Sequence, residues 1–295
     1  MRVVVTGARG KVGRAVVAAV QGAGHEVTEV DLVAPVFEAA LPGEPAYLRA
    51  DLTDAGEAFA VVRGAEVVVH AAAIPDPLHH PPQVVFHNNV MSVFNVLEAA
   101  VRLGVRRFVN ISSETVPGFF FPEREFLPDY LPIDELHPIR PQDPYALGKH
   151  VSEQLMDAAV RRSELRCSSI RPSWVQHAGN IERNLGPIVR EQRIAAPNFG
   201  CYVHADDLAE AIRLAAESDL PGHEVFYAAA ADNAAGLPLG EAVRRRYGDR
   251  IELRLDGLAR EDASAISCAK AERLLGWRPK RSWRDHLDAD GRASA

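Results

Sequence analysis

A glycine-rich turn, TGARGKVG at residues 6–13, separates a short apolar run from a helical pattern of alanine and valine near the start of the chain. Its Gly-x-x-Gly-x-x-Gly spacing lets a ligand approach backbone N–H groups that a Cβ would obstruct. The helix that follows directs its positive dipole end to the same place, which favours a bound phosphate. The turn therefore predicts a strand–turn–helix unit that holds the pyrophosphate of a dinucleotide, although an ordinary tight turn can also carry three glycines.

Strand and helix patterns alternate over the first 171 residues, as is typical of a parallel sheet with helices on both faces. The patterns predict strands at 2–6, 26–31, 46–50, 66–71, 106–112 and 166–171, and helices at 11–24, 54–63, 83–103 and 143–162. We therefore expect a doubly wound α/β (Rossmann) fold with a dinucleotide-binding domain at 1–172. The remainder, 173–295, mixes short elements with proline and glycine, and we expect it to form a smaller, mixed α/β substrate-binding region interleaved with the first domain.

An acidic residue ends the second predicted strand. Asp31 lies 24 residues after Gly7, close to the ~20-residue spacing at which a carboxylate accepts hydrogen bonds from the adenosine ribose. The next residues, Leu32 and Val33, provide no arginine to neutralise a 2′-phosphate, which Asp31 would also repel. We therefore expect NAD rather than NADP as the cofactor, with the Arg9 side chain along the pyrophosphate or in solvent.

The overall charge argues against a nucleic-acid partner. Lys and Arg number 33 against 40 Asp and Glu, a formal net charge of −7, so no general positive field attracts a phosphate backbone. Apolar stretches such as 67–74 are much shorter than the ~20 residues that cross a bilayer, and the chain begins with a strand-like run rather than a signal peptide. The three cysteines form no metal or disulfide pattern. We expect a cytoplasmic protein without a membrane, metal or nucleic-acid partner.

The segment 117–144 interrupts the alternation. It contains seven prolines and five aromatic residues, which make it too irregular for regular elements and too aromatic for a solvated linker. We expect an ordered loop whose Phe119–Phe121 run forms a wall of the substrate pocket.

Tyr145 and Lys149 are four residues apart near the start of the predicted helix at 143–162, so their side chains leave the same face about one turn apart. An ammonium beside a phenol stabilises the phenolate, which makes tyrosine usable for proton transfer near neutral pH. Only four of the 33 basic residues are lysines, so a lysine here favours a chemical requirement over a general cationic surface. Ser112 and Ser113 end a parallel strand at the edge where open α/β sheets bind ligands.

The chain resembles extended short-chain dehydrogenases/reductases of the NAD-dependent epimerase/dehydratase family over nearly its whole length. The resemblance depends on the order of motifs that are individually weak: TGARGKVG at 6–13, Asp31, DLTD at 51–54, HAAA at 70–73, Asn89, ISSETVPG at 111–118, PYALGK at 144–149, IRP at 170–172, YVHADDLAEAI at 202–212 and LLGWRP at 274–279. It implies that Ser113 orients the substrate oxygen. It also implies that Tyr145 exchanges its proton as hydride moves to or from the nicotinamide, and that Lys149 holds the ribose hydroxyls.

The same resemblance implies the residues around the ligands. Asp51 and Leu52 are expected to border the adenine, and residues 71–73 the nicotinamide ribose. The full set expected to bind NAD is Gly7, Arg9, Gly10, Lys11, Val12, Gly13, Asp31, Asp51, Leu52, Ala71, Ala72, Ala73, Asn89, Ile111, Tyr145, Lys149, Arg171 and Ser173. The set expected to bind substrate is Ser113, Glu114, Thr115 and Arg183. Dimers through the helix that bears Tyr145 and the long helix before it are common in the family, so we expect a homodimer.

Three reaction classes compete within this resemblance. Family dehydratases carry an Asp-Glu pair directly after the residue that matches Ser113, whereas this chain has Glu114 and Thr115, so the second acid is missing. Nucleotide-sugar 4-epimerases with a tightly held NAD are the alternative, because they need only the Ser, Tyr and Lys groups. Their diphosphate pocket usually includes an arginine where this chain has Gly200 and Cys201, and the segment 171–202 is short for a nucleotide-binding insertion.

We therefore expect a dehydrogenase that transfers hydride between NAD and a hydroxyl or carbonyl carbon of a small sugar or sugar acid. Arg183 lies twelve residues after Arg171, similar to the carboxylate-binding arginine of uronate dehydrogenases, and a surface position is equally compatible. An NAD-sensing regulatory protein on the same fold would be expected to have lost Ser113, Tyr145 or Lys149, and all three are present.

Overall fold

The computed structural model describes residues 1–34, 44–194 and 197–294, and the chain divides into two compact units. Unit 1 comprises Met1–Ser112, Asp143–Ile170 and Ala209–Val225, and unit 2 comprises Ser113–Gln142, Arg171–Leu208 and Phe226–Ala295. These units differ in two segments from the division expected at residue 172. The segment 113–142 belongs to unit 2, and the segment 209–225 belongs to unit 1.

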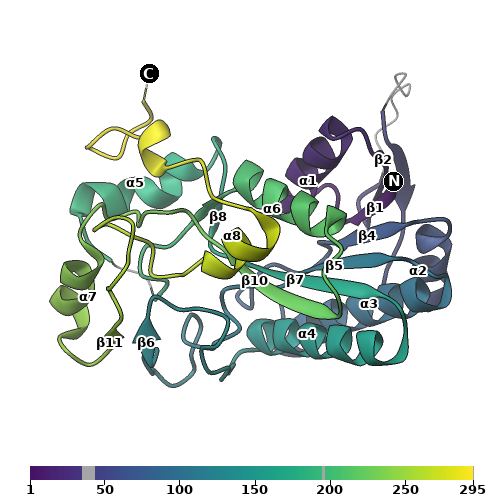
Figure 1. Ribbon diagram of the computed structural model, residues 1–295, viewed down its shortest axis with the longest axis horizontal. Helices are drawn as coiled ribbons and strands as arrows, with labels where there is room; N and C mark the ends of the chain where they lie inside the picture. The colour runs from purple at the N-terminus through teal and green to yellow at the C-terminus, as the bar shows by residue number, and fades with distance from the viewer. Residues whose placement is uncertain (35–43, 195–196, 295) are drawn as a thin grey trace. The chain divides into compact units, whose positions relative to one another are not determined.

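Unit 1 is built on a seven-stranded sheet of order β10-β7-β5-β4-β1-β2-β3, whose neighbouring pairs from β7 to β3 are parallel. The strands are β1 (Arg2–Thr6), β2 (Glu26–Asp31), β3 (Ala46–Arg49), β4 (Val67–His70), β5 (Arg107–Ile111), β7 (Arg166–Pro172) and β10 (His223–Ala228), the last two ending in unit 2. The helices are α1 (Lys11–Gly22), α2 (Ala55–Val62), α3 (Pro82–Arg102), α4 (Pro144–Arg162) and most of α6 (Ala205–Glu217). Figure 1 shows α1 and α6 on one face and α3 and α4 on the other. The doubly wound α/β fold is confirmed.

The two central strands explain why the chain folds this way. Val3–Val5 of β1 and Val67–Val69 of β4 are almost fully buried, as expected for parallel strands covered on both faces by helices. The two strands are neighbours, but the sheet continues through β2 on one side and β5 on the other. Their carboxyl ends therefore form the switch point at which sheets of this kind bind ligands.

Helix α3 is long and apolar enough to cross a membrane by length and composition, and half of its apolar window is buried within the protein. Val93, Val96 and Leu97 of α3 belong to the same core cluster as Val68 and Phe108 of the sheet. Packing on the sheet therefore accounts for the buried half of the apolar window of α3.

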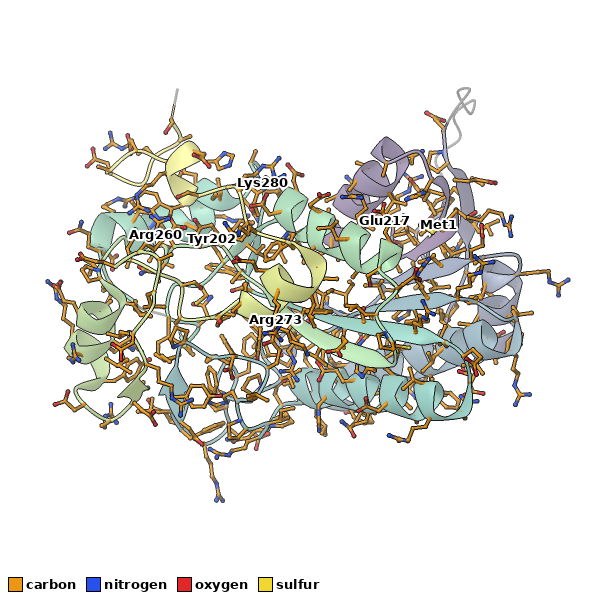
Figure 2. All side chains as sticks on the ribbon, in the orientation of Figure 1. Met1, Tyr202, Glu217, Arg260, Arg273 and Lys280 are labelled. Atoms are coloured by element: carbon orange, nitrogen blue, oxygen red, sulfur yellow. The ribbon has the colours of Figure 1, made fainter. Side chains whose placement is uncertain are left out.

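Helix α6 is fixed to the start of the sheet by a polar chain. Nδ1 of His25 lies 3.4 Å from the amino group of Met1, and its Nε2 lies 2.8 Å from the carboxylate of Glu217. Met1 and Glu217 are labelled in Figure 2. Arg213 also pairs with Glu217, so the end of α6 is held by charged contacts within unit 1.

Unit 2 has shorter elements. They are β6 (Tyr130–Leu131), β8 (Val175–Gln176), α5 (Ile181–Glu191), β9 (Val203–His204), α7 (Leu239–Tyr247), β11 (Glu252–Leu253), α8 (Ala269–Leu275) and the 3₁₀ helix η1 (Trp283–Asp285). Strand β6 pairs with β11 and β8 pairs with β9, both in parallel.

The aromatic loop supplies part of the core of unit 2. The rings of Phe119 and Phe120 stack with centroids 4.7 Å apart, and Phe119 meets Phe199 edge-on. Both loop residues are buried and belong to this core, against which Phe121 also packs. Phe119 and Phe120 therefore have a structural role in the core of unit 2, and the expectation that this run forms a wall of the substrate pocket stays a prediction. The physical reason for the structural role is that the short elements around the loop need large apolar side chains to form a core.

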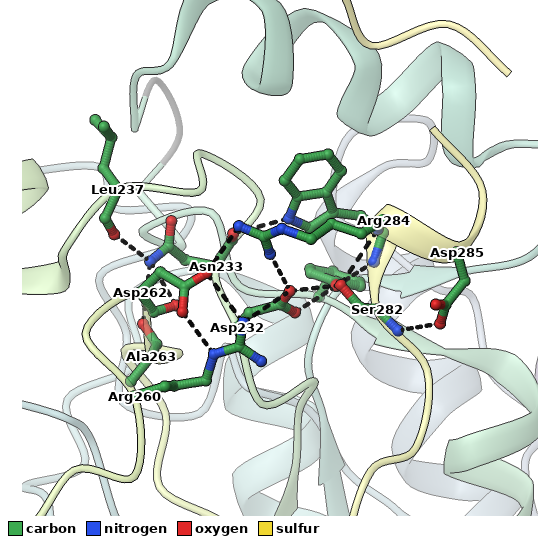
Figure 3. Close-up of polar contacts among 11 residues, drawn as sticks. Asp232, Asn233, Leu237, Arg260, Asp262, Ala263, Ser282, Arg284 and Asp285 are labelled. Carbon is green, nitrogen blue, oxygen red and sulfur yellow. Dashed lines mark hydrogen bonds and ion pairs between the residues drawn. The ribbon is translucent and has the colours of Figure 1, made fainter. Parts of the chain in front are cut away.

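An ionic network holds the C-terminal segment of unit 2 (Figure 3). The fully buried carboxylate of Asp232 accepts the hydroxyls of Tyr202 and Ser282, each at 2.6 Å. Arg284 pairs with Asp232 at 2.6 Å and with Asp262 at 2.8 Å. Because the hydroxyls and Arg284 compensate its burial, Asp232 acts as an anchor for residues 282–284.

Candidate active site

The glycine turn after β1 leaves no room for side chains. Gly7 has a φ of +67°, and a Cβ there would lie 2.6 Å from the Ala72 nitrogen. A Cβ at Gly13 would lie 2.1 Å from the carbonyl oxygen of Gly7. Helix α1 then begins at Lys11 without a side-chain cap or an acid in its first turn, so its first N–H groups can bind an anion. The turn has the backbone geometry that a pyrophosphate requires.

A groove of about 370 Å³ lies beside this turn within unit 1. Of the residues expected to bind NAD, it is lined by Gly7, Arg9, Gly10, Asp31, residues 51–52 and residues 71–73. The strands β1, β2 and β4 all end here, so the groove lies at the switch point of the sheet.

Three expected cofactor residues support this groove without lining it. Gly13 shapes the turn, as described above, and Lys11 and Val12 begin α1. Asn88 and Ser92 of α3 also line the groove, and neither residue was predicted from the sequence.

Asn89 holds the backbone at the edge of the groove. Its Oδ1 accepts the N–H of Ile74 at 2.8 Å, and its Nδ2 donates to the carbonyl of Ile74 at 3.0 Å. This pair of bonds fixes the segment after β4, since Ile74 itself lines the groove. Asn89 therefore supports the edge of the groove, and its contact with NAD stays a prediction.

Asp31 is fixed at the end of β2 by backbone donors. Its carboxylate accepts the N–H groups of Arg9 at 2.9 Å and Leu32 at 2.7 Å. The Arg9 guanidinium lies 4.5 Å from the ring centroid of Tyr47 and 3.4 Å from the carboxylate of Glu29. Arg9 also lines the groove and is partly exposed, so its place along a pyrophosphate or in solvent stays a prediction, with Tyr47 and Glu29 as its partners in this structure.

Helix α4 carries Tyr145 and Lys149 on its buried face. Asp143 caps the helix, and its carboxylate accepts the N–H of Tyr145 at 2.9 Å. Nζ of Lys149 donates to the carbonyl of Ile111 at 2.6 Å and lies 5.7 Å from the ring centroid of Tyr145. Burial lowers the pKa of Lys149 to about 8, and the charge of Glu153 opposes this effect. The structure therefore brings together Ile111, Tyr145 and Lys149 as a unit suited to stabilising a phenolate.

His70, at the end of β4, is a buried neighbour of Lys149 that was not predicted as a site residue from the sequence. Its Nδ1 lies 3.0 Å from the hydroxyl of Thr6, which also accepts the N–H of Ala72 at 3.3 Å. Burial and the charge of Lys149 lower the pKa of His70 to about 3. His70 is therefore neutral at physiological pH and links the ends of β1 and β4 through Thr6. Its position at the start of the HAAA motif at 70–73 was the sequence signal that could have identified it.

In unit 2, Ser113 is arranged as a hydrogen-bond donor. Its Oγ accepts the N–H of Thr115 at 3.1 Å and the hydroxyl of Thr115 at 3.0 Å. Because both accepting positions are used, the Ser113 hydrogen is available to a ligand oxygen. Thr115, which stands where the family dehydratases have their second acid, therefore donates hydrogen bonds to Ser113.

Glu114, the residue after Ser113, is buried and forms hydrogen bonds with the segment that begins at Pro172. It accepts the hydroxyl of Ser173 at 2.5 Å, and its N–H donates to the carbonyl of Pro172 at 3.0 Å. Burial raises the pKa of Glu114 to about 8, while hydrogen bonds from Ser173 and Asn198 oppose this effect. Glu114 is therefore mostly protonated at neutral pH.

The pKa of Glu114 predicts a loss of stability between about pH 5 and pH 8. The folded protein keeps the proton up to about pH 8, whereas an ordinary glutamate loses it near 4.5. Between these values the unfolded state binds fewer protons, so the free energy of unfolding falls as pH rises, by at most about 1.4 kcal/mol per pH unit. Glu114→Gln should remove this decrease. Thermal unfolding midpoints of both proteins from pH 5 to 8 test it, and equal slopes would contradict the assignment.

Three further residues that were expected to bind NAD or substrate lie in unit 2. Arg171 is buried, donates to the hydroxyl of Tyr227 at 3.3 Å and lies over its ring. Ser173 binds Glu114, as described. Arg183 is exposed near the start of α5 and contacts the adjacent Asn184 at 3.4 Å, which agrees with the surface alternative.

Comparisons with known proteins give a family, two relatives and a similar solved structure. The model of the NAD dependent epimerase/dehydratase family matches residues 3–190. A UDP-glucose 4-epimerase of Corynebacterium glutamicum is 28% identical over 309 residues, covering 95% of this chain and 91% of the relative. A uronate dehydrogenase of Pseudomonas putida is 28% identical over 170 residues, covering 58% of this chain and 59% of the relative. The solved structure of MoeE5 in complex with UDP-glucuronic acid and NAD has a TM-score of 0.71 at 24% identity, covering 96% of this chain and 95% of that one.

Proposed function

The chain belongs to the NAD dependent epimerase/dehydratase family, and we propose that it transfers hydride between NAD and a hydroxyl or carbonyl carbon of a small sugar or sugar acid. One observation carries this proposal: unit 1 combines the glycine turn and its groove with the Tyr145–Lys149 pair of α4. The first feature suits a dinucleotide, and the second suits proton transfer at a hydroxyl.

The groove fits NAD in four respects. The glycine turn excludes the Cβ atoms that would block a pyrophosphate, and the uncapped start of α1 offers it N–H donors. Asp31 presents a carboxylate for the adenosine ribose, and the segment 71–73 lines the same groove. When bound, NAD supplies the acceptor or donor of the hydride. The chain has to bind it, orient it and move the accompanying proton.

Three side chains have separate roles in the transfer of the proton. Tyr145 takes the proton of the substrate hydroxyl during oxidation and returns it during reduction. The Lys149 ammonium stabilises the phenolate that this exchange requires and donates to the nicotinamide ribose. Ser113 donates a hydrogen bond to the substrate oxygen, because Thr115 occupies its accepting positions.

Asp31→Ala is expected to weaken NAD binding by roughly 1–3 kcal/mol, because the ribose hydroxyls lose their acceptor. The preference over NADP should narrow, since the repulsion of the 2′-phosphate is also removed. Calorimetric titration with each dinucleotide measures both effects. Glu29→Ala is the matched control on β2, because Glu29 pairs with Arg9 but does not line the groove. A wild-type protein that binds NADP as tightly as NAD would refute this assignment.

A nucleotide-sugar 4-epimerase that retains NAD is the second candidate, because the epimerase relative covers 95% of the chain. The segment before β9 argues for the smaller substrate. Gly200 has a φ of +73°, with the Ala234 nitrogen 3.5 Å from the position of a Cβ, and Cys201 is fully buried. Neither residue presents a cation to a diphosphate.

A screen of candidate substrates tests the proposal directly. The purified protein is incubated with NAD and a panel of free sugars, uronates and UDP-sugars, and NADH is followed by its absorbance. Reduction of NAD with a free sugar or a uronate supports the proposal. Conversion of a UDP-sugar without net NADH formation supports the epimerase.

We further propose a homodimer formed through α3 and α4. The two helices expose Val84, Phe94 and Leu147, apolar side chains that a partner subunit could cover. A cytoplasmic location agrees with the three free cysteines, since reducing compartments keep thiols unpaired.

A further inference from the structure

Glu153 is a buried acid that the reaction described above does not use. It lies on the inner face of α4, is 3% exposed, and accepts the hydroxyl of Ser112 at 2.6 Å. A carboxylate in such a place is unfavourable unless an opposite charge and hydrogen bonds compensate it. Its environment therefore has to contain a compensating group.

Lys149 provides that opposite charge. It precedes Glu153 by four residues, so the two side chains share one face of α4, and Lys149 is itself only 7% exposed. Nζ of Lys149 donates to the carbonyl of Ile111, while Glu153 accepts from Ser112, the next residue. The cation and the anion of α4 thus bind consecutive residues where β5 ends. Removing either would leave the other buried without its counter-charge.

The groups that face Lys149 come from three elements. Helix α4 contributes Tyr145 and Glu153, β4 contributes His70, and the end of β5 contributes the carbonyl of Ile111 with the hydroxyl of Ser112. His70 is neutral, because its pKa is about 3. Among these described groups, Glu153 is the anion, and its negative charge favours the charged form of Lys149. With this help, the pKa of Lys149 is about 8, only slightly above physiological pH.

We propose that Glu153 is a positioning residue of the active site, whose carboxylate keeps the Lys149 ammonium charged and fixes the end of β5 through Ser112. Its catalytic consequence rests on the proposed function, in which a charged Lys149 holds the ribose and stabilises the Tyr145 phenolate. The charge coupling itself needs neither cofactor nor substrate, so it can be measured without activity.

Side-chain NMR of lysine provides this measurement. The chain contains four lysines, Lys11, Lys149, Lys270 and Lys280, so labelling the lysine ε-carbon with ¹³C gives a small set of signals. The signal that disappears in Lys149→Met belongs to Lys149. We expect its pKa to fall from about 8 in the wild type to about 7 or below in Glu153→Gln, because burial remains while the compensating charge is lost. An unchanged pKa would overturn the proposal.

The helix offers a matched control. Asp157 lies one turn beyond Glu153 and pairs with His223 at 2.8 Å, so Asp157→Asn makes the same chemical change away from Lys149. It should leave the titration of Lys149 unchanged. Glu153→Asp retains the charge and should restore most of the wild-type pKa. If Glu153→Gln does not fold, Glu153→Asp and Ser112→Ala still test the idea, because both keep the anion and should keep Lys149 charged above pH 7. A pKa of Lys149 below 7 in both variants would refute it.

The pH profile of turnover provides the catalytic readout. In Glu153→Gln the alkaline decline should begin at lower pH, so the ratio of the rates at pH 8 and pH 6.5 should fall several-fold relative to the wild type. Asp157→Asn should retain the wild-type ratio. If no sugar is turned over but the NMR shift appears, the proposed function fails while the coupling stands. If turnover occurs but the NMR and pH profiles match the wild type, the role of Glu153 fails.

Discussion

Tyr145→Phe is expected to lower turnover by ~10²-fold or more while leaving NAD affinity within a few-fold, the usual scale for a general acid–base group. The substitution removes only the phenolic oxygen. The ring of Tyr145 can still pack on the buried face of α4, and Lys149 can still donate to Ile111. Binding of the dinucleotide should therefore persist when proton transfer is lost.

The experiment measures kcat with the best substrate of the screen and NAD affinity by calorimetry. Tyr47→Phe is the matched control, because Tyr47 is also in unit 1 and its hydroxyl donates to the carbonyl of Val33. That variant should keep ordinary turnover. A Tyr145→Phe protein that retained most of its activity would show that another group transfers the proton.

The sheet and its glycine turn were predictable because their signals are local. Runs such as Val67–Val69 are apolar at every position, which is typical of strands buried on both faces, and the structure buries them. The turn at 6–13 requires glycine for a steric reason that is visible in the sequence, and a Cβ at Gly13 would indeed meet the Gly7 carbonyl. The i, i+4 spacing of Tyr145 and Lys149 likewise follows from helix geometry alone.

Other features depend on contacts between distant segments. Arg9 lies over Tyr47, and no local pattern relates a turn after β1 to a residue on β3. Phe119 packs on Phe199, eighty residues later in the chain, so its role in the core of unit 2 could not be distinguished from a pocket wall. The role of Glu153 depends on its hydrogen bond from Ser112, which lies 41 residues earlier in the chain and which no local pattern relates to it.

The second prediction with a large expected effect concerns substrate size. We expect NAD reduction with a free sugar or uronate, and no interconversion of UDP-glucose and UDP-galactose at an ordinary enzymatic rate. An arginine that binds a diphosphate through two charge-assisted hydrogen bonds contributes ~1.5–3 kcal/mol, or about 10- to 150-fold in affinity. This chain has Gly200 and buried Cys201 at the corresponding place.

UDP alone separates the two candidates without any need to find the natural substrate. A protein built for a nucleotide sugar should bind UDP tightly in the presence of NAD, because the diphosphate supplies much of the contact, whereas a site for a small sugar should bind it weakly. The same sample is assayed for UDP-galactose formation, and the NAD content of the protein is measured before and after gel filtration. Loss of NAD on filtration fits a dehydrogenase that exchanges its cofactor in each turnover. Tight UDP binding, retained NAD and rapid epimerisation together would make the epimerase the function of this chain. They would also show that other residues bind the diphosphate in place of the arginine that Gly200 and Cys201 replace.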